Sequence, residues 1–398
     1  MSVTETTRES WISRLGNSIR GIVAGVIMFI LGFPLLFWNE GNSVRTAKAL
    51  AEGEGACVPL ESVETVDPDY EGRLIHATAK ADTDATLLDN EFGIAVNAIR
   101  LERNVEMYQW EEESQTREKK NLGGSVTRQT TYTYHKTWSD QVIDSSSFKE
   151  SGHDNPGAMG YSELERQAEV VRFGAFQLTD GQIGRIGGAH DYEFPTDYVC
   201  PVASAQRSGN ILYIPGTSGS TATNAATGTN ATAVAVRNVA ASPEIGDMRV
   251  TFSIVTPHVI SIVAKQRGGT FASYIAKNGK KVDLMAEGSR DAAEMFASAR
   301  RGNAIFTWIL RLAGFLLMYI GLATVLKPLS VIGDVVPFIG TIIGMGTGFV
   351  AGIVAMACAL VTIAVAWIFY RPIIGIALLA IAAFLVWKLW QKKHNVKM

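Results

Sequence analysis

The chain has 398 residues, of which 47% are hydrophobic and 19% are charged, and its net charge is −2. A chain so close to neutral produces no strong overall field, which argues against a nucleic-acid partner. The apolar runs gather at the two ends, whereas residues 41–301 have the polar composition of an ordinary folded domain. This division predicts an integral membrane protein with a large domain in water.

The first apolar run, residues 21–38, has no charged residue. Eighteen helical residues at about 1.5 Å each just span the roughly 30 Å of hydrocarbon in a bilayer. Trp38 suits the membrane interface, and the following Asn39-Glu40-Gly41 is typical of a helix end. Small residues at 47–51 offer a cleavage site, but the apolar run exceeds the roughly 7–15 residues of a signal peptide. We therefore predict an uncleaved anchor.

The second apolar region begins at residue 303. Residues 303–325 form a second predicted span that contains one charge, Arg311. Residues 338–370 carry no charge, and as one helix they would be about 50 Å long, which exceeds the hydrocarbon thickness. Pro337 and the glycines after it predict a break in this run.

That break divides the C-terminal region. Residues 326–348 are predicted to be a cytoplasmic loop with an interfacial or re-entrant segment, and residues 349–370 a third span. Residues 372–390 are the predicted fourth span, and residues 391–398 a lysine-rich tail.

Basic residues predict the topology. Residues 1–20 and the C-terminal tail are basic, so both are expected in the cytoplasm, which four spans satisfy. Residues 39–302 are then extracytoplasmic, although Arg300 and Arg301 beside the second span weaken this assignment. The predicted fold class is an α+β membrane protein, with one N-terminal and three C-terminal transmembrane helices around a β-rich extracytoplasmic domain.

The polar middle is predicted to contain a long antiparallel hairpin. Residues 105–112 and 130–139 alternate between polar and aromatic side chains, and residues 121–124 between them are typical of a turn. The aromatic side chains form either a partner-binding surface or ordinary sheet packing. The candidate interaction residues are Tyr108, Trp110, Tyr132, Tyr134 and Trp138.

Other segments of the middle are also assigned. Residues 247–255 and 259–266 are predicted strands, and residues 290–299 a helix that leads into the second span. Residues 44–52 either continue the first helix or form a separate one. Residues 217–232 are a Ser/Thr/Gly-rich insert predicted to be a flexible surface loop.

Two polar features raise functional hypotheses. His153 and Asp154 could act as acid and base, but the surrounding Gly-His-Asp-Asn-Pro-Gly suits a turn and no nucleophile motif accompanies it. Arg311 lies inside a predicted span, where an ionisable residue suggests function. It either extends to the interface or pairs inside the bundle with a lipid head group or a backbone carbonyl, because the predicted spans contain no acidic residue.

Glycines recur at every fourth position in residues 340–352, which places them on one smooth helix face. The face could mediate self-association, line a pathway or pack against another span of the same chain. Cys57 and Cys200 could pair in an oxidising compartment, and that alternative stays open. No Cys or His spacing indicates a metal, and no cofactor is expected. The candidate packing glycines are Gly340, Gly344, Gly348 and Gly352.

Several longer runs together resemble the transmembrane protein 43 family, also called LUMA. They occur in the family's order and cover nearly the whole chain, whereas the insert at residues 217–232 departs from the animal members. The runs are LLFWNEGNSVRTAKAL, NVEMYQWEEE, TYTYHKTWSDQVIDSSSF, GHDNPGAM, EIGDMRVTFS, VISIVAKQRGG and FYRP.

The resemblance implies a four-span protein with a large lumenal domain and no catalytic residues. It also implies self-association and an endoplasmic-reticulum or inner-nuclear-membrane location, with lamins and emerin as partners of the animal members. For a bacterial chain the expected location is the inner membrane, with the large domain in the periplasm, and those two partners do not apply.

The function expected from the sequence is a non-enzymatic, multi-pass scaffold or adaptor. It would organise membrane protein complexes through its extracytoplasmic domain and through self-association. The expected partners are the lipid bilayer, further copies of the chain and an unidentified membrane protein. A sensor or enzyme at the extracytoplasmic face is the first alternative, and a transporter or channel is the second.

Overall fold

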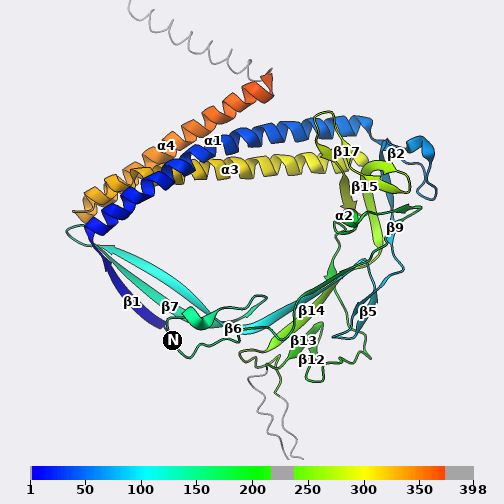
Figure 1. The fold of residues 1–398 in the computed structure, drawn as a ribbon, viewed down its shortest axis with the longest axis horizontal. Helices are drawn as coiled ribbons and strands as arrows, with labels where there is room; N and C mark the ends of the chain where they lie inside the picture. The colour runs from blue at the N-terminus through cyan, green and yellow to red at the C-terminus, as the bar shows by residue number, and fades with distance from the viewer. Residues whose placement is uncertain (1, 217–236, 373–398) are drawn as a thin grey trace, which may run out of the picture.

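The computed structural model describes residues 2–216 and 237–372 (Figure 1). The predicted insert at 217–232 and residues 373–390 of the predicted fourth span lie outside the described residues. Two long helices lie side by side, a third helix lies against them at one end and diverges toward its C-terminal end, and most of the other described elements are strands (Figure 1). Among the described residues, three helices have the length and composition to cross a membrane: one is N-terminal and two are C-terminal.

The helices are α1 (Trp11–Ala56), α3 (Ala292–Gly333) and α4 (Pro337–Tyr370). α1 and α3 run in opposite directions, and their backbones touch where small residues meet (Figure 1). A Cβ atom added to Gly25 would lie 2.7 Å from the carbonyl oxygen of Gly321. Only glycine permits such an approach, which gives close van der Waals packing between helices.

The end predicted for the first helix is wrong. α1 continues through Asn39-Glu40-Gly41 to Ala56, so the alternative in which residues 44–52 extend the first helix is confirmed. Asn39 and Glu40 are fully buried in the described structure. Side chains on α3 and α4 donate hydrogen bonds to the Glu40 carboxylate, and the Asn39 amide N–H donates to the carbonyl of Thr307 on α3, so these polar residues are held inside the bundle and do not end the helix.

Within residues 326–348 the helical structure is interrupted at residues 334–336, directly before Pro337, so the loop is shorter than predicted and the glycines after Pro337 do not break the helix. α3 begins after Asp291, whose carboxylate accepts a hydrogen bond from the backbone N–H of Glu294 at 2.7 Å. It continues to Gly333, and after residues 334–336 the next helix starts at Pro337 and runs unbroken past all the glycines. Proline suits the first turn of a helix because its missing N–H would have no partner there.

The larger sheet contains the predicted hairpin, which is confirmed. β6 (Arg100–Lys120) and β7 (Val126–Ser139) pair from Met107 opposite Ser139 to Lys120 opposite Val126. The sheet continues as β1, β7, β6, β14, β13 and β12, with β8 and β11 attached. The remaining bounds are β1 (Ser2–Glu9), β8 (Leu164–Gln167), β11 (His190–Asp191), β12 (Gln206–Ser208), β13 (Ile211–Ile214) and β14 (Met248–Val255).

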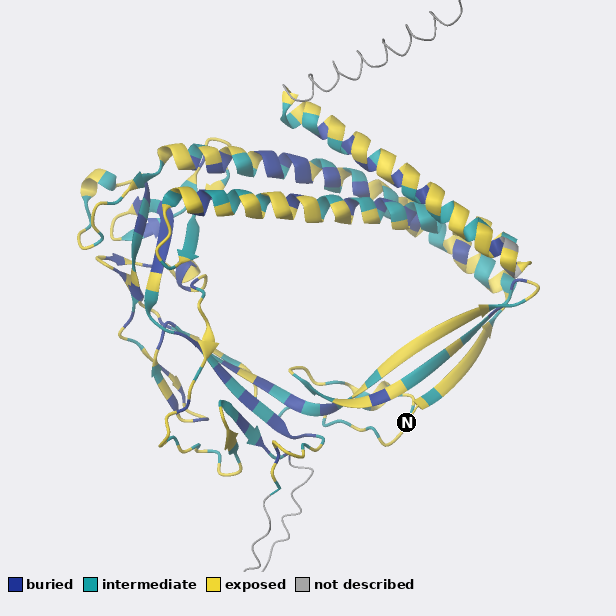
Figure 2. Cartoon of the chain, turned by 180° about the vertical axis from the view of Figure 1, so that it is seen from behind, coloured by how far each residue is buried: buried dark blue, intermediate teal, exposed yellow. Residues whose placement is uncertain are grey.

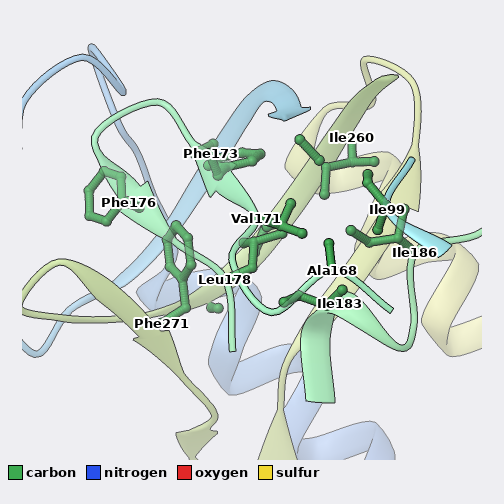
Figure 3. Close-up of a cluster of buried hydrophobic side chains, with 14 of the residues drawn as sticks. Ile99, Ala168, Val171, Phe173, Phe176, Leu178, Ile183, Ile186, Ile260 and Phe271 are labelled. Carbon is green, nitrogen blue, oxygen red and sulfur yellow. The ribbon is translucent and has the colours of Figure 1, made fainter. Parts of the chain in front are cut away.

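The second sheet closes on itself. β3 and β15 pair directly and are also joined through β9, β10 and β16, so these five strands form a small barrel. Phe173, Phe176 and Phe271 pack together in its core with Val171 and Ile260 (Figure 3). The bounds are β2 (Val58–Pro59), β3 (Leu74–Asp82), β9 (Arg172–Phe173), β10 (Phe176–Gln177), β15 (His258–Arg267), β16 (Thr270–Ala272) and β19 (Leu284–Glu287).

Short elements complete the described chain. The predicted strands at 247–255 and 259–266 correspond to β14 and β15, which belong to different sheets and thus connect them. The remaining elements are β4 (Thr86–Asp89), β5 (Ile94–Asn97), α2 (Asp180–Ile183), β17 (Tyr274–Ile275), β18 (Lys281–Val282) and the 3₁₀ helices Pro68–Tyr70 and Ser145–Ser147.

A three-stranded ribbon returns from the β-structure to the far end of the helices (Figure 1). We define the ribbon as β1, β7 and residues 107–120 of β6; β1 pairs with β7 from Ser2 opposite Thr133 to Glu9 opposite Val126. At about 3.3 Å per residue, the 21 residues of β6 extend about 69 Å. At about 1.5 Å per residue, the 46 residues of α1 reach the same length. The helices and the ribbon therefore form a ring.

The ring conflicts with the predicted division between a cytoplasmic N-terminus and an extracytoplasmic domain. Residues 2–9 were assigned to one side of the membrane and residues 126–133 to the other, yet they are neighbouring strands. Strands that share a hydrogen-bond ladder lie in one compartment. Exposed residues run along both the ribbon and the helices, so burial alone does not mark a membrane boundary (Figure 2).

Candidate functional site

The first notable site is a buried carboxylate inside the helix bundle. Glu40 of α1 is 1% exposed, and its two oxygens accept hydrogen bonds from Nε and Nη2 of Arg311 at 2.6 and 2.9 Å. Trp367 of α4 donates its indole N–H to the same carboxylate at 2.8 Å. A planar guanidinium matches a carboxylate in this two-point geometry. The site therefore joins the three long helices α1, α3 and α4.

Aromatic rings flank the arginine of this pair. The guanidinium carbon of Arg311 lies 4.7 Å from the ring centre of Trp308 and 5.8 Å from that of Trp367. Cation–π contacts of this kind stabilise a cation that has left water. One turn away, Asn39 donates to the carbonyl of Thr307 at 3.0 Å. The polar groups thus form a layer across the bundle.

The structure corrects the prediction for Arg311. The sequence suggested a head group or a backbone carbonyl as its partner, because the predicted spans contained no acidic residue. Glu40 lies just beyond the predicted first span, and it becomes the partner because α1 continues past that boundary. The signal that the sequence analysis missed is the charge of Arg311, because a largely buried arginine requires a carboxylate or an equally strong acceptor.

The second site lies where the hairpin turn meets the helices, and we call it the clasp. Asp334, which is 1% exposed, accepts hydrogen bonds from Arg14 at 2.6 Å and from Lys120 at 2.7 Å. Arg14 also donates to the carbonyl of Gly124 at 2.6 Å, and Trp11 donates to that of Val331 at 2.8 Å. Three segments that are distant in the sequence therefore meet at one carboxylate.

The predicted glycine face contacts α3 of the same chain. A Cβ atom on Gly340 would overlap the carboxylate of Asp334, and one on Gly344 would lie 2.9 Å from the hydroxyl of Ser330. At Gly348 and Gly352 the nearest neighbour is Tyr319, at 3.7 Å. Packing within the chain therefore uses this face. The sequence analysis missed that a second set of glycines, Gly25 and Gly32 on α1 and Gly314 and Gly321 on α3, brings α1 and α3 together.

The aromatic residues of the hairpin meet across the strands. Tyr108 faces Trp138 with ring centres 5.1 Å apart, and Lys136 lies 4.8 Å from the ring centre of Trp110. Arg249 of β14 lies 4.9 Å from the ring centre of Trp138. Pairs of this kind stabilise neighbouring strands. Binding of a partner by these residues stays a prediction.

His153 packs within the same aromatic group. Its ring stacks on Tyr134 at 4.0 Å and meets the edge of Trp110 at 4.6 Å. Burial, and then the hydrogen bond to Glu112, raises the pKa of Tyr134. Asp154 is exposed, and the ring contacts of His153 explain its position without a catalytic role.

Tyr132, the remaining hairpin residue, lies farther along the ribbon. Its hydroxyl donates to Glu5 of β1 at 3.3 Å, and the amine of Lys149 lies 5.8 Å from its ring centre. Cys57 and Cys200 are both free, so the disulfide alternative is not realised in this structure. Burial raises the pKa of the Cys57 thiol to about 11.

Comparisons with known proteins identify the family of this chain. Residues 107–372 match the family described as Transmembrane protein 43. The chain is 31% identical to human Transmembrane protein 43 over 96% of this chain and 92% of the human protein. It is 30% identical to the Drosophila melanogaster homolog over 96% of this chain and 95% of the fly protein. No solved structure is significantly similar to the chain. The chain therefore belongs to the transmembrane protein 43 family of membrane proteins.

Proposed function

We propose that this chain is a non-enzymatic membrane scaffold that associates with further copies of itself and with other membrane proteins. The observation that carries the proposal is the edge strand β1. Among the described residues, β1 pairs only with β7, so its other edge has free backbone N–H and C=O groups over residues 2–9. An edge of this kind adds a strand from another chain through main-chain hydrogen bonds.

The composition of β1 supports pairing rather than protection of the edge. Its sequence, Ser-Val-Thr-Glu-Thr-Thr-Arg-Glu, contains one valine and three threonines, which favour strands, and no proline. Two antiparallel copies can place Thr6 opposite Thr6 and Arg8 opposite Thr4, a register in which no like charges are directly opposed. The edge therefore suits a second copy of β1.

A pair of proline variants tests this edge. N–H groups of successive strand residues point to opposite edges, so Thr6→Pro and Thr7→Pro each remove a donor from a different edge. The mass of the protein in nanodiscs reports its oligomeric state. We expect the proline on the outer edge to reduce the oligomer to a monomer while the β1–β7 pairing persists.

The matched variant gives the control. The proline facing β7 should loosen the ribbon, which a disulfide between cysteines at positions 4 and 131 would detect. A wild-type chain that is monomeric in nanodiscs and forms no cross-links to itself in its native membrane would overturn self-association. Cross-linking in that membrane, followed by mass spectrometry, tests the adaptor role by identifying membrane proteins captured next to the ribbon.

A further inference from the structure

A hollow of about 430 Å³ lies where the first turns of α3 meet the barrel (Figure 1). Its walls come from β19, from the segment that follows α2 and from the start of α3. Its floor is apolar, because Ile186, Ile260 and Met295 are at most 4% exposed. We call this space the α3 hollow. Its volume is that of a site for a small ligand or for the polar part of a larger one.

The charged side chains of the α3 hollow are not all paired with each other. Arg185 and Arg290 each have a carboxylate partner at 2.7 Å. Glu287 and Arg301, in contrast, form no hydrogen bond or ion pair with any other described residue. The hollow therefore presents one free carboxylate and one free guanidinium. The charged residues that line it are Arg185, Glu287, Arg290, Glu294 and Arg301.

The free carboxylate lies against a glycine on the opposite wall. A Cβ atom added to Gly187 would overlap a carboxylate oxygen of Glu287. Both residues line the α3 hollow, so the carboxylate of Glu287 is held at its wall. A cationic group inside the hollow can reach this carboxylate, and an anionic group can reach Arg301.

The face of α3 that carries Arg301 continues as an exposed apolar stripe. Ile305, Trp308 and Leu312 follow Arg301 at spacings of three and four residues, which places all four on one side of the helix. The three apolar side chains are exposed in the described structure. Leu312 lies about 16 Å along the helix from Arg301, close to half of the roughly 30 Å of hydrocarbon in a bilayer. Trp308 suits the membrane interface. A polar group in the hollow is therefore continuous with a surface for acyl chains.

We propose that the α3 hollow binds the head group of a phospholipid that carries a primary amine, of the phosphatidylethanolamine type. Arg301 donates hydrogen bonds to the phosphate, and the carboxylate of Glu287 accepts hydrogen bonds from the ammonium group. The acyl chains lie along the stripe from Ile305 to Leu312. A zwitterionic head group matches one free cation and one free anion, whereas a choline head group has no N–H to donate and a glycerol head group has no cation for Glu287.

Native mass spectrometry of the full chain in detergent tests this selectivity. Protein stripped of lipid is titrated separately with phosphatidylethanolamine, phosphatidylcholine and phosphatidylglycerol that have the same acyl chains. We expect one molecule of phosphatidylethanolamine to bind about tenfold more tightly than phosphatidylcholine, because only the primary amine forms a charged hydrogen bond with Glu287. Equal binding of the three lipids would overturn the proposal.

A soluble head group separates a lipid from a free phosphodiester. Glycerophosphoethanolamine has the same phosphate and amine but no acyl chains. We expect it not to displace phosphatidylethanolamine at equal concentration, because the stripe on α3 contributes to binding only through the chains. Full displacement would mean that the ligand is a soluble phosphodiester, which would overturn the assignment to a lipid.

Three variants assign the two contacts. Arg301→Gln should weaken phosphatidylethanolamine and phosphatidylcholine alike by about tenfold, because both lose the phosphate contact. Glu287→Gln should mainly reduce the preference for ethanolamine over choline. Arg300→Gln is the matched control, because Arg300 pairs with Glu54 at 2.5 Å and is not among the described residues that line the hollow. Equal losses in Arg300→Gln and Arg301→Gln would indicate a general effect of charge and would overturn the proposal.

Discussion

The two buried carboxylates, Glu40 and Asp334, share chemistry but differ in surroundings. Glu40 pairs with Arg311, which is 17% exposed, between helices that are packed along much of their length. Asp334 pairs with Arg14 and Lys120, which are 13% and 32% exposed, where the hairpin turn meets the helices. The first carboxylate lies within an extensive interface, whereas the second connects parts that are otherwise held by a few contacts.

The two carboxylates should therefore affect different properties: Glu40 the stability of the helix bundle, and Asp334 the closure of the ring. Removing the carboxylate leaves the largely buried Arg311 as an uncompensated charge between closely packed helices, so the effect at Glu40 should spread to the whole bundle. At the clasp, water can reach a released lysine, and the hairpin turn can move away from the helices. A change there should open the ring locally.

The largest effect is expected at the bundle. Glu40→Gln should lower the free energy of unfolding by about 3–5 kcal/mol, because Arg311 then stays buried without a counter-charge. Denaturant unfolding in detergent, followed by tryptophan fluorescence, measures this loss. The double variant Glu40→Gln with Arg311→Gln should lose less than the sum of the single losses.

An exposed ion pair provides the control for this experiment. Arg172 and Asp84 lie 2.5 Å apart but are 48% and 80% exposed. Arg172→Gln should change stability by at most about 1 kcal/mol. If Glu40→Gln has an effect as small as that, the assigned role of Glu40 in the bundle is wrong.

At the clasp the expected effect is smaller and local. Asp334→Asn should weaken the clasp by about 2 kcal/mol, because two charged hydrogen bonds are lost, while Arg14 keeps the carbonyl of Gly124 and the part-exposed Lys120 regains water. Hydrogen exchange should speed up at the turn, where the N–H of Gly123 donates to the carbonyl of Val335 at 3.0 Å. Unchanged exchange at Gly123 would mean that Asp334 does not hold the turn.

The glycine face gives a way to disturb the clasp without changing charge. Gly340→Ala places a methyl group against the Asp334 carboxylate and should destabilise the chain by about 1–3 kcal/mol. Gly348→Ala is the matched control, because its nearest neighbour would be Tyr319 at 3.7 Å. Thermal unfolding of the two variants measures the difference, and equal effects would contradict the packing described for Gly340.

Ionic strength should affect the ion pairs of the two carboxylates to different extents, with smaller effects than the substitutions. Lys120 at the clasp is part-exposed, so raising the ionic strength should screen its pairing and speed exchange at the hairpin turn. The Glu40 pair lies inside the bundle and should respond little. Exchange rates measured at low and high salt provide the comparison, and a stronger response at the bundle would reverse the distinction.

The smallest loss of stability is expected at an uncharged contact, the stacking of His153 on Tyr134. His153→Ala removes the stacking on Tyr134 and should lower stability by about 1 kcal/mol. Asp154→Ala alters an exposed side chain and should stay within about 0.5 kcal/mol of the parent chain. Chemical unfolding of both variants measures this, and a larger loss at Asp154 would return attention to the acid–base hypothesis.

Local patterns predicted much of the fold. The alternation of side chains identified the β6–β7 hairpin, and hydropathy identified the membrane helices. The family was recognised from runs spread along the chain, which the comparisons confirm. Each of these signals lies within a short window of sequence.

The errors came from contacts between distant residues. Asn39-Glu40-Gly41 has the composition of a helix end, yet Arg311, 271 residues away, gives Glu40 a buried partner. Residues 2–9 lack strong hydrophobic alternation and form a strand because β7 provides the ladder. No local rule indicates either partner, so the clasp and the ring could not be predicted from the sequence.

The long-range pairing of β1 has a consequence for biosynthesis. β1 is translated before its partner β7, which follows more than 100 residues later, and Asp334 follows later still. Contacts between distant segments form late because a long loop must close before they contribute stability. The nascent chain must therefore keep its N-terminus and the hairpin in the same compartment until α3 has emerged from the ribosome. Because α4 follows Asp334 in the chain, the ring can close before this last described helix has been inserted.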